Sequence, residues 1–317
     1  MGLTVETGRA LTRTIKAKAA ELGFAKVGIA RADALTEEGA RLREWLARGY
    51  NGTMEWMKRN PERRVDPREI VPGAKSVVSV AINYYADVRH SVDPEAGKIS
   101  RYAWGDDYHL IMTPRIQKLL DCIKSENPDV EARIYVDTGP VMDKAWAVKS
   151  GIGWLGKHTN VITKEYGSWV FLGEIILDVE LAYDEPIADF CGTCRACIDA
   201  CPTGAIVEPY LLDSNKCISY LTIEHKGEIP GELKPKFENW VYGCDICQDV
   251  CPWNNFQQQT REQAFLPREA NIAPRLEELD RMTGGEFSRR FRRSPVKRTK
   301  IQGMKRNIRA VLEGRQR

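Results

Sequence analysis

The sequence has 317 residues, of which 43% are hydrophobic and 29% are charged, and this composition is ordinary for a globular protein. It excludes an intrinsically disordered chain, and the length suits one large domain with an embedded module, or two domains. The net charge of +3 is unevenly distributed, because residues 281–317 contain 13 Lys and Arg against 2 Glu. That segment therefore carries +11 and the rest of the chain −8.

The first 23 residues are typical of an amphipathic helix, without the apolar run of a signal peptide and without a twin-arginine pair. No later stretch approaches about 18 continuous apolar residues, so the sequence predicts no membrane span. We therefore expect a cytoplasmic protein. In that reducing compartment, nine cysteines indicate metal binding or catalysis rather than disulfides.

Short apolar segments rich in β-branched residues predict strands, and helical patterns separate them. They cover residues 25–29, 76–85, 132–137 and 169–181. This alternation predicts an α/β or α+β domain over residues 1–185. Residues 186–260 are dense in Cys, Gly and Pro and predict a ferredoxin-like module, and residues 261–317 predict a basic helical tail. No Gly-x-Gly-x-x-Gly or Walker A loop is present, so dinucleotide binding in a familiar mode is not expected.

The cysteine spacing carries the strongest chemical signal in the chain. The first motif, CGTCRACIDACP at residues 191–202, matches the bacterial ferredoxin run, in which three cysteines hold one 4Fe-4S cluster and the fourth reaches across to another. Cys217 and the segment CDICQDVCP at residues 244–252 complete a second motif. The same crossing assigns Cys191, Cys194, Cys197 and Cys251 to one cluster, and Cys201, Cys217, Cys244 and Cys247 to the other.

Zinc is the main alternative, since four-cysteine zinc sites also use Cys-x-x-Cys pairs. Three evenly spaced cysteines followed by Cys-Pro suit paired clusters better than two separate tetrahedral sites. The ninth cysteine, Cys122, lies in the helical stretch IQKLLDCIK and is expected to be a small core residue. Two clusters in a chain this long predict an electron acceptor, either a cofactor or a substrate, in the N-terminal domain.

The basic tail permits two interpretations. A solvated, charged helix surface is the commoner outcome for a run such as RRFRR at residues 289–293. The concentration of charge favours a surface that binds a polyanion, and nucleic acid in particular.

With these motifs, the chain resembles the epoxyqueuosine reductases, bacterial enzymes of the last step of queuosine synthesis on tRNA. The resemblance covers nearly all of residues 5–315 and corresponds to a short form without the C-terminal helical repeats of longer members. Besides both cysteine motifs, its blocks are AINYY (81–85), RYA (101–103), DYH (107–109), YVDTGP (135–140), GWLGK (153–157), SPVKR (294–298) and RN (306–307).

The resemblance implies a fold and chemistry similar to those of reductive dehalogenases, with cobalamin in the N-terminal domain. The clusters would reduce the cobalt, and the epoxide of epoxyqueuosine, at the wobble position of a tRNA anticodon, would lose its oxygen to give the alkene of queuosine. The partners implied are this tRNA and an unidentified low-potential electron donor, with no membrane. We expect the enzyme to act as a monomer.

Asp137 is the candidate proton donor. From the residues alone, catalysis and helix capping are equally good interpretations, because Pro140 is typical of the first residue of a helix. The resemblance favours catalysis. His109 is not assigned as a cobalt ligand, because Met112 stands where the Asp-x-His-x-x-Gly motif of other cobalamin proteins requires Gly.

Matching positions imply further contacts. Tyr102 and Trp154 are candidate pocket residues, although aromatic side chains are more often core. Residues that would contact the corrin, besides Asp137, are Asn60, Arg101, Asn160, Ser168, Ser214 and Asp245. Residues that would contact tRNA phosphates are Lys226, Arg298 and Lys300.

Three other functions remain open. A cobalamin-dependent reductive dehalogenase acting on a small molecule is one alternative, but it would not need the basic tail. A two-cluster electron-transfer protein would have no substrate of its own. An RNA-binding protein could hold its clusters for structural reasons only. Cobalamin binding separates the enzymes from the last two, and tRNA binding separates the reductase from the dehalogenase.

Overall fold

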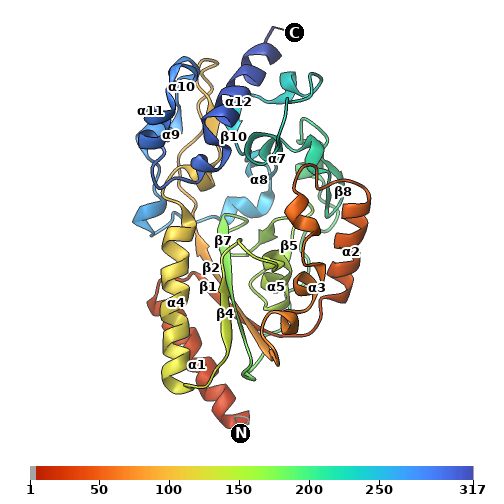
Figure 1. The fold of residues 1–317 in the computed structure, drawn as a ribbon, viewed down its shortest axis with the longest axis vertical. Coiled ribbons are helices and arrows are strands. Elements are labelled where there is room, and N and C mark those ends of the chain that lie inside the picture. Colours follow the sequence, from red (N-terminus) through yellow and green to blue (C-terminus); the bar gives the residue numbers. More distant parts are fainter. Residues whose placement is uncertain (1–4, 317) are drawn as a thin grey trace.

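A computed structural model describes residues 5–316, so residues 1–4 of the predicted N-terminal helix and Arg317 of the predicted tail lie outside the described residues. A four-stranded antiparallel sheet forms one half of the molecule (Figure 1). Its strands, in spatial order, are β1 (Lys26–Arg31), β2 (Ser76–Asn83), β7 (Val170–Leu177) and β4 (Ala132–Tyr135). The four predicted strands are therefore confirmed, and the antiparallel pairing makes the domain α+β.

Helices cover both faces of this sheet. On one face lie α1 (Val5–Glu21) and α4 (Tyr108–Glu126), and their apolar side chains form the largest core with alternate residues of the strands. The opposite face is covered by α5 (Asp143–Lys149), with α2 (Thr36–Ala47) and α3 (Pro61–Val65) beyond it (Figure 1). Strand β7 is apolar on both faces because both are covered.

One glycine allows α5 to lie close to the sheet. A Cβ atom on Gly28 of β1 would lie 2.0 Å from the carbonyl oxygen of Ser150, at the end of α5. Only glycine fits this approach without movement of the backbone.

The other half of the molecule holds a second core, which joins segments far apart in the sequence. It contains β3 (Lys98–Ile99) paired in parallel with β10 (Trp240–Tyr242), together with α7 (Ile218–Ile223) and α12 (Lys300–Gly314). The predicted basic tail is part of this core, since Phe291, Met304 and Ile308 are fully buried. The tail is therefore a helical layer on the cysteine module, with its charged residues on the outside.

Short elements complete the chain. They are β5 (Trp154–Leu155), β6 (Val161–Ile162), α6 (Ala196–Asp199), β8 (Ile206–Glu208), β9 (Leu211–Leu212), α8 (Ile246–Asp249), α9 (Glu269–Ile272), α10 (Leu276–Arg281) and α11 (Gly284–Arg290). Among residues 5–316, no helix has the length and apolar character needed to cross a bilayer.

Candidate active site

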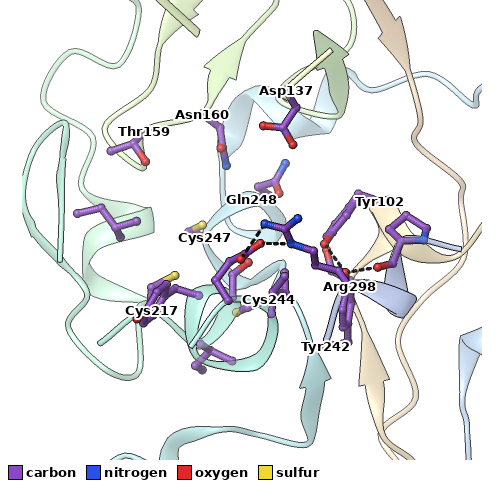
Figure 2. Close-up of a pocket in the computed structure, with 18 of the residues that line it drawn as sticks. Tyr102, Asp137, Thr159, Asn160, Cys217, Tyr242, Cys244, Cys247, Gln248 and Arg298 are labelled. Carbon is purple, nitrogen blue, oxygen red and sulfur yellow. Dashed lines mark hydrogen bonds and ion pairs between the residues drawn. The ribbon is translucent and has the colours of Figure 1, made fainter. Parts of the chain in front are cut away.

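A cavity of about 940 Å³ lies between the two halves of the molecule. This volume is at the upper end of the range for small-molecule and cofactor sites. Figure 2 shows Asp137 and Asn160 on one side of the cavity and Cys217, Cys244 and Cys247 on the other. The sheet contributes its end to the cavity, through Val170, Phe171 and Leu172 of β7.

The cysteines divide into two groups. Cys201, Cys217, Cys244 and Cys247 all line the cavity, and they interact electrostatically with one another. Cys191, Cys194, Cys197 and Cys251 form the second group, and of these Cys191 and Cys251 pack against Trp154. The crossed pairing expected from the sequence assigns these same two groups to separate clusters, and that assignment stays a prediction.

The thiols are crowded, and their exposure ranges from the buried Cys197 and Cys251 to the exposed Cys194. Burial, followed by the nearby Cys251, Cys191 and Cys194, raises the pKa of Cys197 to about 11. Burial and the neighbouring Cys217 and Cys201 raise the pKa of Cys247 well above its ordinary value. Free thiolates would repel one another here, whereas bound iron would neutralise them.

The loop around Cys191–Cys194 is tied down by a lysine. The Nζ of Lys157 donates to the carbonyl oxygens of Gly192 (2.5 Å) and Cys194 (2.8 Å). The backbone N–H of Cys194 donates to the carbonyl of Cys191 at 3.0 Å. These bonds preform a tight loop, which suits three closely spaced thiolates around one cluster.

Asp137 lies in the loop between β4 and α5, with its side chain on the cavity. The hydroxyl of Tyr108 donates to its Oδ2 at 2.5 Å. Tyr108 is held by stacking on Phe171, with ring centroids 4.4 Å apart. Burial and the charge of Asp137 raise the pKa of Tyr108, so this hydroxyl stays protonated and remains a donor.

The helix-capping interpretation of Asp137 is wrong. Helix α5 begins at Asp143 rather than at Pro140, and its N-cap residue is Met142. Asp137 has a φ of 57°, in the left-handed region that residues other than Gly, Asn and Asp rarely adopt. Its carboxylate is directed to Tyr108 and the cavity instead of the first turn of a helix.

His109 follows Tyr108 and also lines the cavity. Its Nδ1 lies 2.8 Å from Oδ1 of Asp107, and its Nε2 is buried without a hydrogen-bond partner. Burial alone would lower the pKa of His109, but the bond to Asp107 and the charges of Asp107 and Asp137 raise it. The protonated ring is therefore favoured.

Lys144 is a cavity residue that sequence reasoning missed. Its Nζ donates to Oδ1 of Asn160 at 2.9 Å, and burial lowers its pKa despite the charges of Asp137 and Asp143. Asn160 was predicted as a cofactor contact, and its side chain lies on the cavity. A lysine in the first turn of a short helix carries no pattern that marks it as functional.

The remaining predicted cofactor contacts are not among the cavity-lining residues. Asn60 is exposed next to α3, and Ser214 is buried at the start of a 3-10 turn. The buried hydroxyl of Ser168 bonds with Asn254 and Gln248. For these three residues, contact with a corrin stays a prediction.

Arg101 and Asp245 form a buried network beside Cys244, in the cysteine group that lines the cavity. The carboxylate of Asp245 is fully buried and accepts from the hydroxyl of Ser100 (2.5 Å), the backbone N–H of Arg101 (2.9 Å) and the guanidinium of Arg101 (3.2 Å). It also lies 2.9 Å from Nε2 of His90. Burial alone would raise the pKa of Asp245, but His90, Arg101 and Ser100 lower it. These contacts give Asp245 a structural role next to Cys244.

Of the candidate tRNA contacts, only Arg298 lines the cavity. Its guanidinium pairs with both oxygens of Glu224 at 2.9 and 3.1 Å (Figure 2). Lys226 and Lys300 are exposed. Tyr102 lines the cavity as predicted, whereas Trp154 is buried beside Trp253, away from it.

Comparison with known proteins gives consistent matches. Residues 190–254 match a family described as "4Fe-4S double cluster binding domain", and residues 64–138 match "Epoxyqueuosine reductase QueG, DUF1730". An epoxyqueuosine reductase of Leadbetterella byssophila is 50% identical over 305 residues, which cover 96% of this chain and 99% of that protein.

Solved structures agree with this match. An epoxyqueuosine reductase with an epoxyqueuosine-modified tRNA-Tyr stem loop superposes with a TM-score of 0.90 at 35% identity, over 96% of this chain and 81% of that one. The Bacillus subtilis enzyme, solved with an aspartate-bearing catalytic loop swung out of its active site, gives a TM-score of 0.89 at 34% identity, with the same coverage.

Replacement of Asp245 by Asn should destabilise the protein strongly. The variant removes the fully buried charge and leaves Arg101 with only its pair to the less buried Asp249, and breaking a buried ion pair by removing one partner costs about 3–5 kcal/mol in the free energy of unfolding. The measurement is thermal unfolding at matched cluster content. Asp199→Asn is the control, because Asp199 forms an exposed pair with Arg195 and should change that free energy by about 1 kcal/mol or less. Equal effects of the two substitutions would contradict the structural role of Asp245.

Proposed function

The chain belongs to the epoxyqueuosine reductase family, and we propose that it reduces epoxyqueuosine to queuosine at the wobble position of tRNA anticodons. One observation carries the proposal: the cavity has four cysteines on one wall and an aspartate on the opposite wall. Reduction of an epoxide to an alkene consumes two electrons and two protons and releases water. The cavity offers an electron source and a proton source on its two sides.

Two 4Fe-4S clusters would supply the electrons one at a time. The match of residues 190–254 to a double-cluster domain supports both clusters. We propose the crossed pairing, in which Cys251 serves the outer cluster with Cys191, Cys194 and Cys197. The other cluster, here called the inner cluster, would be held by Cys201, Cys217, Cys244 and Cys247. It would lie at the cavity, since these four cysteines all line the cavity.

The cavity residues fit cobalamin. The volume of about 940 Å³ is large, and the lining offers both apolar area and hydrogen-bonding groups for the amide side chains of a corrin. Among these groups are the amides of Asn160 and Gln248, the amine of Lys144 and the hydroxyl of Thr159. When bound, cobalamin would supply a reduced cobalt, a strong reductant and nucleophile towards a strained epoxide. The protein would position the substrate and manage its protons.

Asp137 is the proposed donor to the departing oxygen. Its carboxyl faces the cavity, and the Tyr108 hydroxyl fixes the orientation of that carboxyl. The Bacillus subtilis relative, whose catalytic loop carries an aspartate, supports this assignment. Water is then the leaving group in place of hydroxide, which lowers the barrier to C–O cleavage.

The tRNA would approach over the part of the cavity that Arg298 and Lys297 line. The stem-loop complex of the relative supports tRNA as the substrate. Lys226 and Lys300 are exposed and would contact phosphates, which position the tRNA without reading its sequence.

The direct test is turnover. The protein is purified anaerobically and given cobalamin, a low-potential reductant and epoxyqueuosine-bearing tRNA, and the digested tRNA is analysed by mass spectrometry. Queuosine that forms only with cobalamin present is the expected result. Reduced clusters without queuosine would favour a plain electron-transfer protein.

Cys251→Ala and Cys194→Ala should damage the same cluster, although the two residues belong to different motifs. Each removes a thiolate from the outer cluster in the crossed pairing. Iron content and the electron paramagnetic resonance spectrum of the reduced protein report which cluster is lost. Cys122→Ala is the control and should retain both clusters, since Cys122 lies on α4. If the two variants lost different clusters, the crossed pairing would be wrong.

Replacement of Arg298 and Lys300 by Ala should weaken tRNA binding and its dependence on salt. Each lost phosphate contact reduces counterion release, so the slope of log K against log salt should flatten by about 0.7–0.9 per contact. Arg281→Ala is the matched control, because Arg281 is exposed on α10 and does not line the cavity. An unchanged slope for the double variant would indicate that the basic tail is a solvated surface that does not contact tRNA.

Asp137→Asn should abolish most turnover while leaving the site assembled. The amide retains an oxygen that accepts from Tyr108, so clusters, cobalamin and tRNA should still bind. Loss of a positioned general acid should reduce queuosine formation by about 10²- to 10⁴-fold. Asp33→Asn, at an exposed carboxylate, is the control. Wild-type turnover of Asp137→Asn would remove Asp137 from the mechanism.

A further inference from the structure

Two buried carboxyl groups, those of Glu174 and Asp143, lie beneath the loop of residues 136–142, which carries Asp137. Glu174 is in the middle of β7, on the face covered by α5, and it is fully buried. Neither of its carboxyl oxygens accepts a hydrogen bond from a backbone or side-chain donor among residues 5–316. Asp143, the first residue of α5, has a buried Oδ1 that likewise accepts no hydrogen bond from a donor among the described residues.

The two carboxyl groups face each other. Glu174 and Asp143 interact directly, and each also senses the charge of Asp137. Because an isolated buried carboxylate is costly and two adjacent ones are more so, such a pair retains one proton between its members. A singly protonated pair satisfies itself, since the acid donates to the carboxylate.

We propose that Glu174 and Asp143 hold one proton between them, and that this shared proton positions the loop of Asp137 for the reaction. The pair is a positioning device and does not touch the substrate through Glu174, which is absent from the cavity lining. Asp143 lines the cavity and connects the pair to it.

The groups around the pair support a single negative charge. From the sheet, the neighbours of Glu174 in register are Ser79 of β2, whose buried hydroxyl has no partner, and Tyr135 of β4. From the helices, the cations are Lys144 of α5 and Arg64 of α3, which both interact with Asp143. Asp137 is the one further anion among the described groups that act on the pair.

The loop itself has few restraints. The guanidinium of Arg64 donates to the carbonyl of Gly139 at 3.4 Å, and Tyr108 donates to Asp137. Burial, then the charge of Asp143, raises the pKa of Glu174 well above its ordinary value, and burial raises that of Asp143. Loss of the shared proton at high pH would place two anions beneath a third, and repulsion would displace the loop.

The inference rests on the proposed function, because it takes the loop of Asp137 to be catalytic. Hydrogen exchange of residues 136–142 tests the positioning of the loop without any turnover. The positioning proposal and the proposed function can therefore fail separately. In the full-length, cluster-loaded protein, the protection factors of the amides in residues 136–142 should fall by about tenfold per pH unit once the pair begins to lose its proton.

Glu174→Gln separates the shared proton from simple packing. The amide has nearly the same shape and donates to Asp143 without a proton to lose, so the loop should keep its protection at alkaline pH. Asp143→Asn is the second variant, with the roles reversed, should Glu174→Gln fail to fold. The control is Ser76→Ala, at the far end of β2, where the hydroxyl donates to the carbonyl of Val179 and the pH dependence should stay as in the wild type.

Activity provides a second measurement. Glu174→Gln should keep neutral-pH turnover within about tenfold of the wild type and extend activity to higher pH, whereas Glu174→Ala should lower kcat with little change in KM. Infrared difference spectra should show the carboxylic acid band of the pair in the wild type and its loss in Glu174→Gln. Loop protection independent of pH in the wild type, or the wild-type pH dependence in Glu174→Gln, overturns the proposal.

Discussion

The buried carboxylate of Asp245 joins the segment that follows β3 to the cysteine loop of residues 244–247, within the half of the molecule that holds the second core. Ser100, Arg101 and His90 precede the long helix α4, whereas Asp245 lies between Cys244 and Cys247. Removal of this charge from water is expensive, so the network persists only because its donors and counter-charge are all in place. It fixes the loop of Cys244 and Cys247 against the segment after β3, and Arg101 of the same network lies over the ring of Trp169, which belongs to the core of the sheet.

The proposed electron source and the proposed proton donor lie on opposite walls of the cavity. The inner cysteines come from short loops and one-turn helices, whereas Asp137, Tyr108 and Lys144 come from the sheet and its covering helices. Because the two walls belong to different cores, the protein can hold the metal side rigidly while the loop of Asp137 moves. Separate cores also keep the crowded thiols away from the carboxyl groups, which limits repulsion between like charges.

Much of this arrangement could be predicted from the sequence. The four β-branched segments specified the strands, and the cysteine spacing predicted two sets of ligands, of which the members of one set all line the cavity. The start of α5 was predicted three residues early, because Pro140 resembles a first helical residue, and the capping alternative for Asp137 depended on that error. The burial of Asp245 had no local signal, since its partners lie about 145 residues away. Glu174 did carry a signal, as the single charge in the apolar strand VFLGEIIL, and it was overlooked.

The conformation of the Asp137 loop is held by a small balance of energies. A left-handed φ for a residue other than glycine costs on the order of 1–3 kcal/mol. The hydrogen bond from Tyr108 contributes about 0.5–1.5 kcal/mol, and the long bond from Arg64 to Gly139 contributes less. These terms are similar in size, so a small change in local charge is sufficient to move the loop. Under the proposed function, a loop that admits a tRNA nucleotide and then closes on it would benefit from this balance. The carboxyl pair beneath the loop lies where a change of one proton acts most directly on that balance.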